Sequence, residues 1–297
     1  MKRNPLAALT LSGLVLLCSA SYGGGPSLEK QLQADYVNKT LTLRRFYEGD
    51  HLRFLSDGRL RGDAAVGPWT LDGRIEVKEI HVKHDVVEIR GRRINVVFEQ
   101  QPDEKKVFRP VDQIQTLASI DEKVRKDIEK YLRKREVTVE IELPASQPTL
   151  GDTNSAIRAV FLLPGDSMMD VVPGYWQEYF SKLEGRPFVA PSSGKTVYRV
   201  MSKEGAAGSV SAPKALSHDD PEYSDEGRRS KHQGTVLVGL VVNENGDTED
   251  LQIQRPLGVG LDEKTIAAVK NWKFKPALKD GQAVPVAIMV ETSFRLY

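Results

Sequence analysis

The sequence predicts an α+β protein. We expect a β-rich N-terminal domain, a connector, and a small C-terminal domain with a three-stranded antiparallel sheet and helices on one face. Two observations predict it: short apolar runs at period two in the first half, and an Asn-Gly turn between two apolar runs near the end. Period-two alternation is typical of half-buried strands, and Asn-Gly is favoured in tight hairpin turns. The expected segments are residues 1–20, 27–145, 146–211 and 212–297.

Composition places the chain among soluble globular proteins. Of its 297 residues 40% are hydrophobic and 28% are charged, and the length allows about two domains. The formal net charge is +1. A balanced charge gives no electrostatic reason to expect nucleic acid as a partner.

Residues 1–20 read as a secretory signal peptide. Lys2 and Arg3 precede an apolar run over residues 6–17, and small residues then flank a cleavage position after Ala20. The run is shorter than the ~20 residues that span a bilayer. We therefore expect an exported chain. Cys18 is the only cysteine; its lipidation, or retention of the signal, is the alternative that would tether the protein to a membrane.

Residues 27–145 are expected to form a small antiparallel barrel or sandwich with one helix. Apolar side chains recur in short runs, separated by turns such as Ser56-Asp57-Gly58 and Leu71-Asp72-Gly73. Closely spaced strands of this kind are typical of small β folds. The helix is expected within Asp121–Glu136, where Val124 begins a stripe of apolar residues four apart.

Residues 146–211 are expected to connect the two domains. Residues 147–155 read as a polar loop, 156–163 as a strand, and 172–183 as a helix with aromatic residues at helical spacing. A stretch rich in Gly, Ser, Ala and Pro follows, with one expected strand near residues 196–201.

The C-terminal domain is predicted from local signals. Thr235–Val242 and Thr248–Arg255 flank the turn with Asn245-Gly246, which predicts a hairpin. Asp262 is the expected N-cap of a helix ending near residue 271. The last strand alternates, with apolar side chains on one face at Val284, Val286, Ile288, Val290, Phe294 and Leu296.

An ordered set of motifs resembles the C-terminal domain of the TonB family. In chain order these are Pro213, Pro221-Glu222-Tyr223-Ser224, Gly234-Thr235-Val236, Asn245-Gly246, Gly260-Leu261-Asp262, Trp272-Lys273-Phe274-Lys275-Pro276-Ala277 and Gly281 with Val284. Upstream, Gly67-Pro68-Trp69-Thr70 and Val172-Pro173-Gly174-Tyr175-Trp176 resemble the N-terminal part of multi-domain TonB-like proteins.

The resemblance implies a partner and a binding mode. TonB family members transmit proton-motive energy from an inner-membrane complex to outer-membrane transporters, and the C-terminal domain captures an extended transporter segment beside its last strand. An edge strand suits this role because its unpaired backbone groups accept a further strand. The resemblance therefore assigns peptide binding to the backbone of Val286, Ala287, Ile288, Met289, Val290, Glu291, Thr292, Ser293 and Phe294.

Two alternatives remain open for this strand: pairing inside the chain, or pairing with a second copy in a homodimer. An energy transducer also needs a retained membrane anchor and a long Pro-rich spacer, which the sequence does not show. The alternative function is a periplasmic scaffold or ligand-binding protein that dimerises through the C-terminal domain. Fold alone does not decide between these.

No residue pattern predicts catalysis, a metal or a cofactor. His81 and His84 lie three apart on an expected strand, so their side chains point to opposite faces. Arg90, Arg92 and Arg93 read as a solvated strand face rather than a binding patch. The three tryptophans, Trp69, Trp176 and Trp272, are expected in the core.

Overall fold

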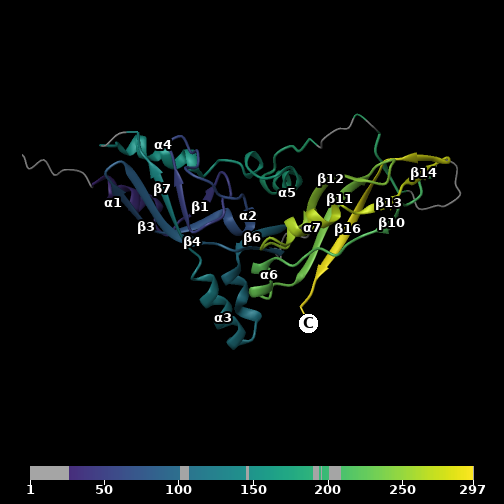
Figure 1. Ribbon diagram of the computed structural model, residues 1–297, viewed down its shortest axis with the longest axis horizontal. Coiled ribbons are helices and arrows are strands. Elements are labelled where there is room, and N and C mark those ends of the chain that lie inside the picture. Colours follow the sequence, from purple (N-terminus) through teal and green to yellow (C-terminus); the bar gives the residue numbers. More distant parts are fainter. Residues whose placement is uncertain are drawn as a thin grey trace, which may run out of the picture.

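The protein is a mixed α+β molecule with one sheet region toward each end (Figure 1). The computed structural model describes residues 27–100, 107–144, 147–189, 194, 196–200 and 209–296. The predicted signal peptide at residues 1–20, with Cys18, lies outside the described residues. No helix within the described ranges is long and apolar enough to cross a membrane.

The N-terminal sheet is open and has six strands in the order β2-β7-β4-β3-β1-β8. Because β2 and β8 are its edge strands, the sheet neither closes into a barrel nor forms the two sheets of a sandwich. All neighbours are antiparallel except β2 and β7, which run parallel. The strands are β1 (Thr40–Leu43), β2 (His51–Phe54), β3 (Arg74–Lys83), β4 (Val86–Arg93), β7 (Glu136–Glu142) and β8 (Phe161–Leu162).

Helices cover the sheet in segments where the sequence predicts loop and strand. Helix α4 (Leu150–Val160) occupies most of residues 147–163, so the predicted polar loop and strand there are wrong except for the two residues of β8. A capping box starts α4: Thr149 and Asp152 each bond the other's backbone N–H, at 3.1 Å. Helix α1 (Leu28–Tyr36) was also not predicted; it buries Leu32 and Tyr36, four residues apart.

A hairpin and a helix connect these elements. β5 (Val96–Gln100) pairs with β6 (Phe108–Asp112), and η1 (Gln113–Ser119) leads into α3 (Glu122–Leu132). The helix predicted within residues 121–136 is confirmed. Leu117, Ile128 and Leu132 form its small core.

The C-terminal sheet has the order β12-β11-β16-β9. Its three long strands and the hairpin at Asn245-Gly246 are as predicted: β11 (Gly234–Val242), β12 (Thr248–Arg255) and β16 (Val286–Phe294). A fourth strand, β9 (Tyr198–Arg199), adds two residues parallel to β16. Two small ladders complete this half: β10 (Lys214–Ser217) with β13 (Lys273–Lys275), and β14 (Ala277–Lys279) with β15 (Gln282–Val284).

Three helices accompany the C-terminal sheet: α5 (Gly174–Glu184), α6 (Asp225–Arg229) and α7 (Leu261–Val269). The N-cap of α7 is Gly260, in the left-handed conformation with φ of 77°, and the predicted cap Asp262 lies inside the first turn. The carboxylate of Asp262 instead accepts the backbone N–H groups of Leu257 and Gly258, at 2.8 and 2.7 Å. It therefore fixes the loop that precedes the helix.

One continuous core joins the two sheets. It contains residues of β3, β4 and β7 together with Val236, Val259 and Phe294 of the C-terminal half. At its centre Trp69 stands edge-on to Trp176, with ring centroids 5.4 Å apart, and Phe98, Tyr179 and Phe180 complete the cluster. Trp69 and Trp176 are 1% and 0% exposed, which confirms them as core residues. The two halves are thus packed as one body.

Candidate functional site

One edge of strand β16 is largely open. On its inner side β11 pairs with it over the whole length, from Val242↔Val286 to Gly234↔Phe294. On the outer side β9 pairs only with Val286 and Ala287. Among the described residues no strand covers that edge from Ile288 to Phe294. The structure therefore pairs two of the nine predicted residues internally and leaves the other seven at an edge.

The direction of the free backbone groups follows from one hydrogen bond. The N–H of Tyr198 donates to the carbonyl oxygen of Pro285, 2.9 Å away, so Pro285 faces the outer edge. Backbone direction alternates along a strand. The N–H and C=O groups of Met289, Glu291 and Ser293 consequently face the same outer edge, beyond the last residue that β9 pairs.

Side chains of β16 divide between two faces. Val286, Thr292 and Phe294 are buried and Ile288 and Val290 are half-buried, all on the face toward α7, where Thr265 contacts Thr292. Those of Ala287, Met289, Glu291 and Ser293 are exposed on the opposite face, and Met289 is 61% exposed. The clean alternation predicted from the sequence is confirmed. The strand is anchored by one set of side chains while the other set stays in solvent.

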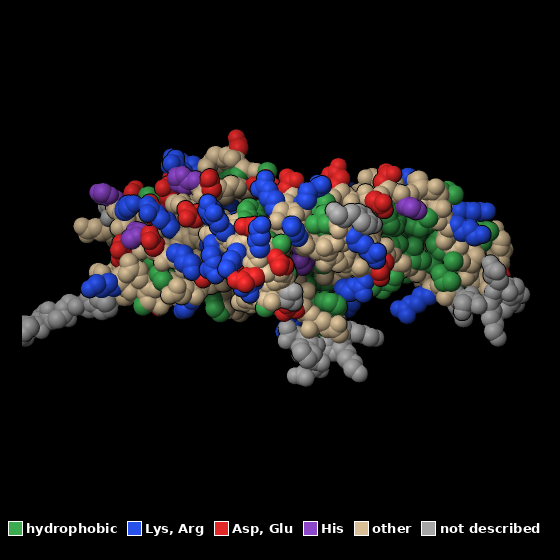
Figure 2. Space-filling model, turned by 90° about the horizontal axis from the view of Figure 1, so that it is seen from below, with side chains coloured by type: hydrophobic (Ala, Val, Ile, Leu, Met, Phe, Trp, Pro, Cys, Tyr) green, Lys and Arg blue, Asp and Glu red, His purple; other side chains and the backbone are tan. Residues whose placement is uncertain are grey.

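A hollow of about 680 Å³ lies beside the end of this edge, and we call it the edge groove. Its walls come from the segment before α6, the residues that follow α7, and the end of β16 with Arg295. Seen from below (Figure 2), apolar side chains gather over the C-terminal half of the molecule. The groove is lined by His218, Asp220, Pro221, Tyr223, Trp272, Glu291, Thr292, Ser293, Phe294 and Arg295.

Two aromatic contacts shape the edge groove. The ring of Tyr223 stands edge-on to Phe294 at 5.3 Å, and its hydroxyl donates to the carbonyl of His232 at 2.5 Å. The indole of Trp272 lies 5.7 Å from the ring of His218 and donates to the carbonyl of Asp219 at 3.0 Å. Trp272 is half-buried at the wall, so the prediction of a core position is wrong. An indole N–H needs a hydrogen-bond acceptor, and a tryptophan therefore often lies at the boundary between core and solvent. This property is the sequence signal that could have placed Trp272 correctly.

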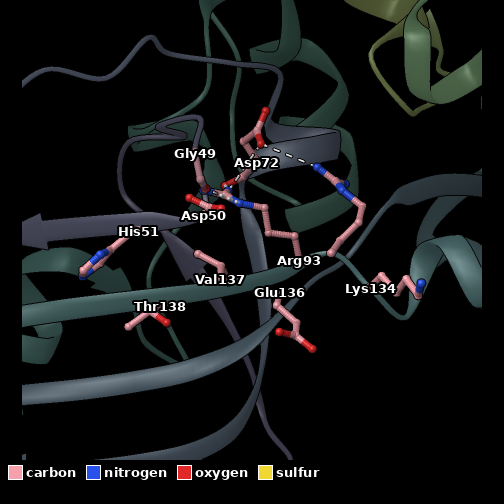
Figure 3. A pocket seen from close by; sticks show the side chains of 10 residues that line it. Gly49, Asp50, His51, Asp72, Arg93, Lys134, Glu136, Val137 and Thr138 are labelled. Atoms are coloured by element: carbon pink, nitrogen blue, oxygen red, sulfur yellow. Dashed lines mark hydrogen bonds and ion pairs between the residues drawn. The ribbon is translucent and has the colours of Figure 1, made fainter.

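A second hollow, of about 710 Å³, lies at the end of the N-terminal sheet (Figure 3). Arg93 is buried here and donates to the carbonyl oxygens of Tyr47, Gly49 and Asp72 at 2.6–2.8 Å. Burial raises the pKa of the Asp72 carboxyl to about 6, against the opposing effect of Arg93 and Arg135. These hydrogen bonds already occupy the guanidinium of Arg93. We therefore interpret Arg93 as a structural residue that holds the loops around β4.

The arginines of β4 do not form a solvated face. Arg93 is 4% exposed, and Arg92 is 8% exposed with ion pairs to Glu76 and Asp112 at 3.0 and 2.6 Å. Only Arg90 fits the prediction. A buried charge needs partners of this kind. Glu76 and Asp112 lie in other segments of the chain than Arg92, so local sequence patterns do not reveal the pairing. No group of three metal-ligating side chains occurs in the described part of the chain.

Known proteins match the C-terminal part of the chain. Residues 219–296 match the family described as Gram-negative bacterial TonB protein C-terminal. Protein tonB2 of Pseudomonas aeruginosa is 33% identical over 82 residues, which are 27% of this chain and 30% of that protein. The solution NMR structure of the Pseudomonas aeruginosa TonB C-terminal domain is 22% identical, with a TM-score of 0.24, and covers 29% of this chain and 89% of that one.

These matches leave most of the chain without a counterpart. The chain spans about a third of the length of the curated relative it matches. Within residues 219–296, however, it carries a TonB C-terminal domain, as the ordered motifs predicted.

Proposed function

We propose that this chain, which carries a TonB C-terminal domain, is an exported cell-envelope protein that binds an extended peptide segment of an outer-membrane transporter. The peptide adds as a strand to the outer edge of β16, in energy-coupled transport across the envelope. The observation that carries the proposal is the open edge from Ile288 to Phe294 beside the edge groove. The role is one of binding, without catalysis.

The edge supplies the affinity through its backbone. Met289, Glu291 and Ser293 present N–H and C=O groups at the spacing that an extended peptide needs. Each hydrogen bond contributes only about 0.5–1.5 kcal/mol, so several bonds are needed to order a flexible peptide. A continuous edge of this length meets that requirement.

The groove supplies preference among peptides. Alternate side chains of an added strand point to opposite faces. One set lies beside the exposed Met289, and the other faces the walls formed by Tyr223 and Trp272. Glu291 is paired with Arg255 at 3.0 Å, which offsets its charge. We therefore expect a peptide with apolar or aromatic residues at alternate positions.

Hydrogen exchange and NMR titration of the isotope-labelled protein test this proposal. Synthetic peptides from the N-terminal segments of outer-membrane transporters serve as probes, with scrambled sequences as controls. We expect slowed amide exchange and shifted resonances at Met289, Glu291 and Ser293, and none in the N-terminal sheet. Shifts spread elsewhere, with an unchanged β16, would contradict strand addition.

A second copy of the chain is the alternative occupant of the same edge. The exposed side chain of Met289 next to the open backbone groups of β16 also favours a dimer, because open strand edges drive self-association. In that case the protein is a periplasmic scaffold or ligand-binding protein that dimerises. Sedimentation of the protein over a range of concentrations separates the two: a monomer supports the peptide role, and a dimer broken by Glu291→Pro supports the scaffold role.

A further inference from the structure

A third hollow, of about 470 Å³, lies in the N-terminal half, far along the chain from β16. Its lining residues come from α1 and the segment after it, from β1, from the start of β3, and from the end of β8 with the segment that follows it. Its size falls within the roughly 300–1,000 Å³ of ligand pockets. Side chains that define its floor and walls are Tyr36, Thr42, Arg74, Leu162, Leu163 and Met168.

Arg74 lines this hollow, and its guanidinium is unpaired within the described part of the chain. No described residue forms a hydrogen bond or an ion pair with it, and its Nε is buried without an acceptor. Its guanidinium lies over the ring of Trp69, whose centroid is 6.0 Å from Cζ, and it also interacts electrostatically with Tyr179. Burial lowers the pKa of Arg74, yet an arginine stays protonated in proteins. A positive charge is thus held half-buried without an anion from the described ranges of the chain.

The other buried arginines show how unusual this is. Arg92 pairs with Glu76 and Asp112, Arg93 contacts Asp72 and three carbonyl groups, and Arg135 lies near Asp72. An unpaired charge removed from water is costly, and proteins normally pair it. Arg74 therefore fits a residue whose partner comes from outside the chain.

We infer that this hollow binds an amphiphilic monocarboxylate, with the carboxylate on Arg74 and the apolar tail along Leu163 and Met168. A guanidinium binds a carboxylate through two parallel hydrogen bonds. Thr42 lies directly opposite Arg74 across the β1–β3 pair and offers a hydroxyl on the same face. Met168 is half-buried and adapts to tails of different shape.

Charges at the rim favour a single negative charge on the ligand. Asp35 and Asp166 line the hollow together with Lys39. Asp166 is neutralised by Arg44 at 2.6 Å and accepts the N–H of Leu163 at 3.1 Å. Asp35 is exposed and would repel a second anionic group of the ligand. A dicarboxylate or a phosphate is therefore disfavoured relative to a monocarboxylate.

Calorimetry with sodium decanoate, below its micelle concentration, tests the inference on the full protein. Two ligands are controls: 1-decanol, with the same tail and no charge, and acetate, with the same head and no tail. We expect decanoate to bind and both controls to bind at least about tenfold more weakly, since each lacks one of the two interactions. Decanol binding as tightly as decanoate, or no decanoate binding at millimolar concentration, would overturn the inference.

Two further measurements separate a ligand role from a structural one. Arg74→Gln is expected to weaken decanoate binding about tenfold or more and, without ligand, to leave the thermal midpoint unchanged or raised, because it removes an unpaired buried charge. Lys39→Gln at the rim is the matched control, with less than threefold effect. Equal decanoate affinity in Arg74→Gln and wild type would overturn the inference.

If Arg74→Gln fails to fold, the Nε–H resonance of Arg74 in wild-type protein decides the matter. It is expected to shift on addition of decanoate and to stay in place with decanol. The outcome is independent of the proposed peptide binding, because the hollow shares no residue with the edge groove.

Discussion

The indole Nε1 of Trp176 donates a hydrogen bond to a carboxylate oxygen of Glu263, 3.0 Å away, and this bond joins helix α5 to helix α7. It lies beside the aromatic cluster that fills the shared core of the two sheets. The other carboxylate oxygen, Oε2, is buried without a hydrogen-bond partner. The TonB C-terminal domain is thus held against the N-terminal half through a carboxyl group removed from water.

The Glu263 carboxyl predicts how stability depends on pH. Burial, and the neighbouring carboxyl of Asp262, raise the pKa of Glu263 above its ordinary value of 4.5. At pH values between the unfolded and the folded pKa of Glu263, the folded state therefore holds a proton that the unfolded state has lost. Stability from this group is full below about pH 4.5 and falls as pH rises toward the raised folded pKa, by up to about 1.4 kcal/mol per pH unit.

Glu263→Gln is expected to remove this contribution. Urea unfolding at pH 5 and pH 8 should show a variant more stable than wild type at pH 8 and a smaller difference between the two pH values. Glu222→Gln, at an exposed carboxylate paired with Lys264, is the control and should keep the wild-type dependence. An identical pH dependence in Glu263→Gln and wild type would show that Glu263 is ionised in the folded protein.

Gly258 is a second point where the two halves meet. Its backbone bridges to Val97 of β5, and the N–H of Val259 donates to the carbonyl of Val96 at 3.0 Å. A Cβ at Gly258 would collide with that carbonyl oxygen, and its φ of 97° is one that L residues rarely adopt.

Gly258→Ala is expected to destabilise the protein by about 2 kcal/mol or more, from backbone strain and the collision together. Gly62→Ala is a matched control, because Gly62 has a φ of 93° and open space around it. We expect about 1 kcal/mol for that variant in urea unfolding. Equal effects of the two substitutions would mean that the contact with Val96 contributes nothing.

Trp272 is predicted to determine peptide preference at the edge groove. Trp272→Ala should weaken peptide binding about tenfold, as truncation of a central tryptophan in an interface does. Leu278→Ala, at a 40% exposed side chain on β14, is the control and should bind as wild type does. Equal affinities of the two variants in calorimetry would exclude the edge groove from the binding site.

Local sequence signals predicted the C-terminal domain well. The Asn245-Gly246 hairpin and the alternation in β16 each depend on neighbouring residues, so periodicity and turn chemistry were enough. Helix α4 was missed because its start depends on a Thr149–Asp152 capping box, while the apolar residues after 155 also fit a strand.

The candidate site was predictable only in part. The residues of β16 followed from the family resemblance, but β9 pairs with that strand from almost ninety residues upstream. The edge groove likewise collects Tyr223, Trp272 and Ser293 from separate segments. The missing partner of Arg74 could be recognised only after the ion pairs of the other arginines were known, since charge alone does not reveal pairing.

Calorimetry of transporter peptides with Glu291→Pro tests strand addition at β16 most directly. The Glu291 N–H faces the open edge, so proline removes a donor offered to the peptide and leaves the pairing with β11 intact. Glu291→Ala is the control at the same position, because it keeps the N–H and loses only the side chain. We predict that Glu291→Pro binds about tenfold more weakly or worse, while Glu291→Ala stays within about fivefold of wild type. Equal affinities of the two variants would contradict peptide binding at this edge.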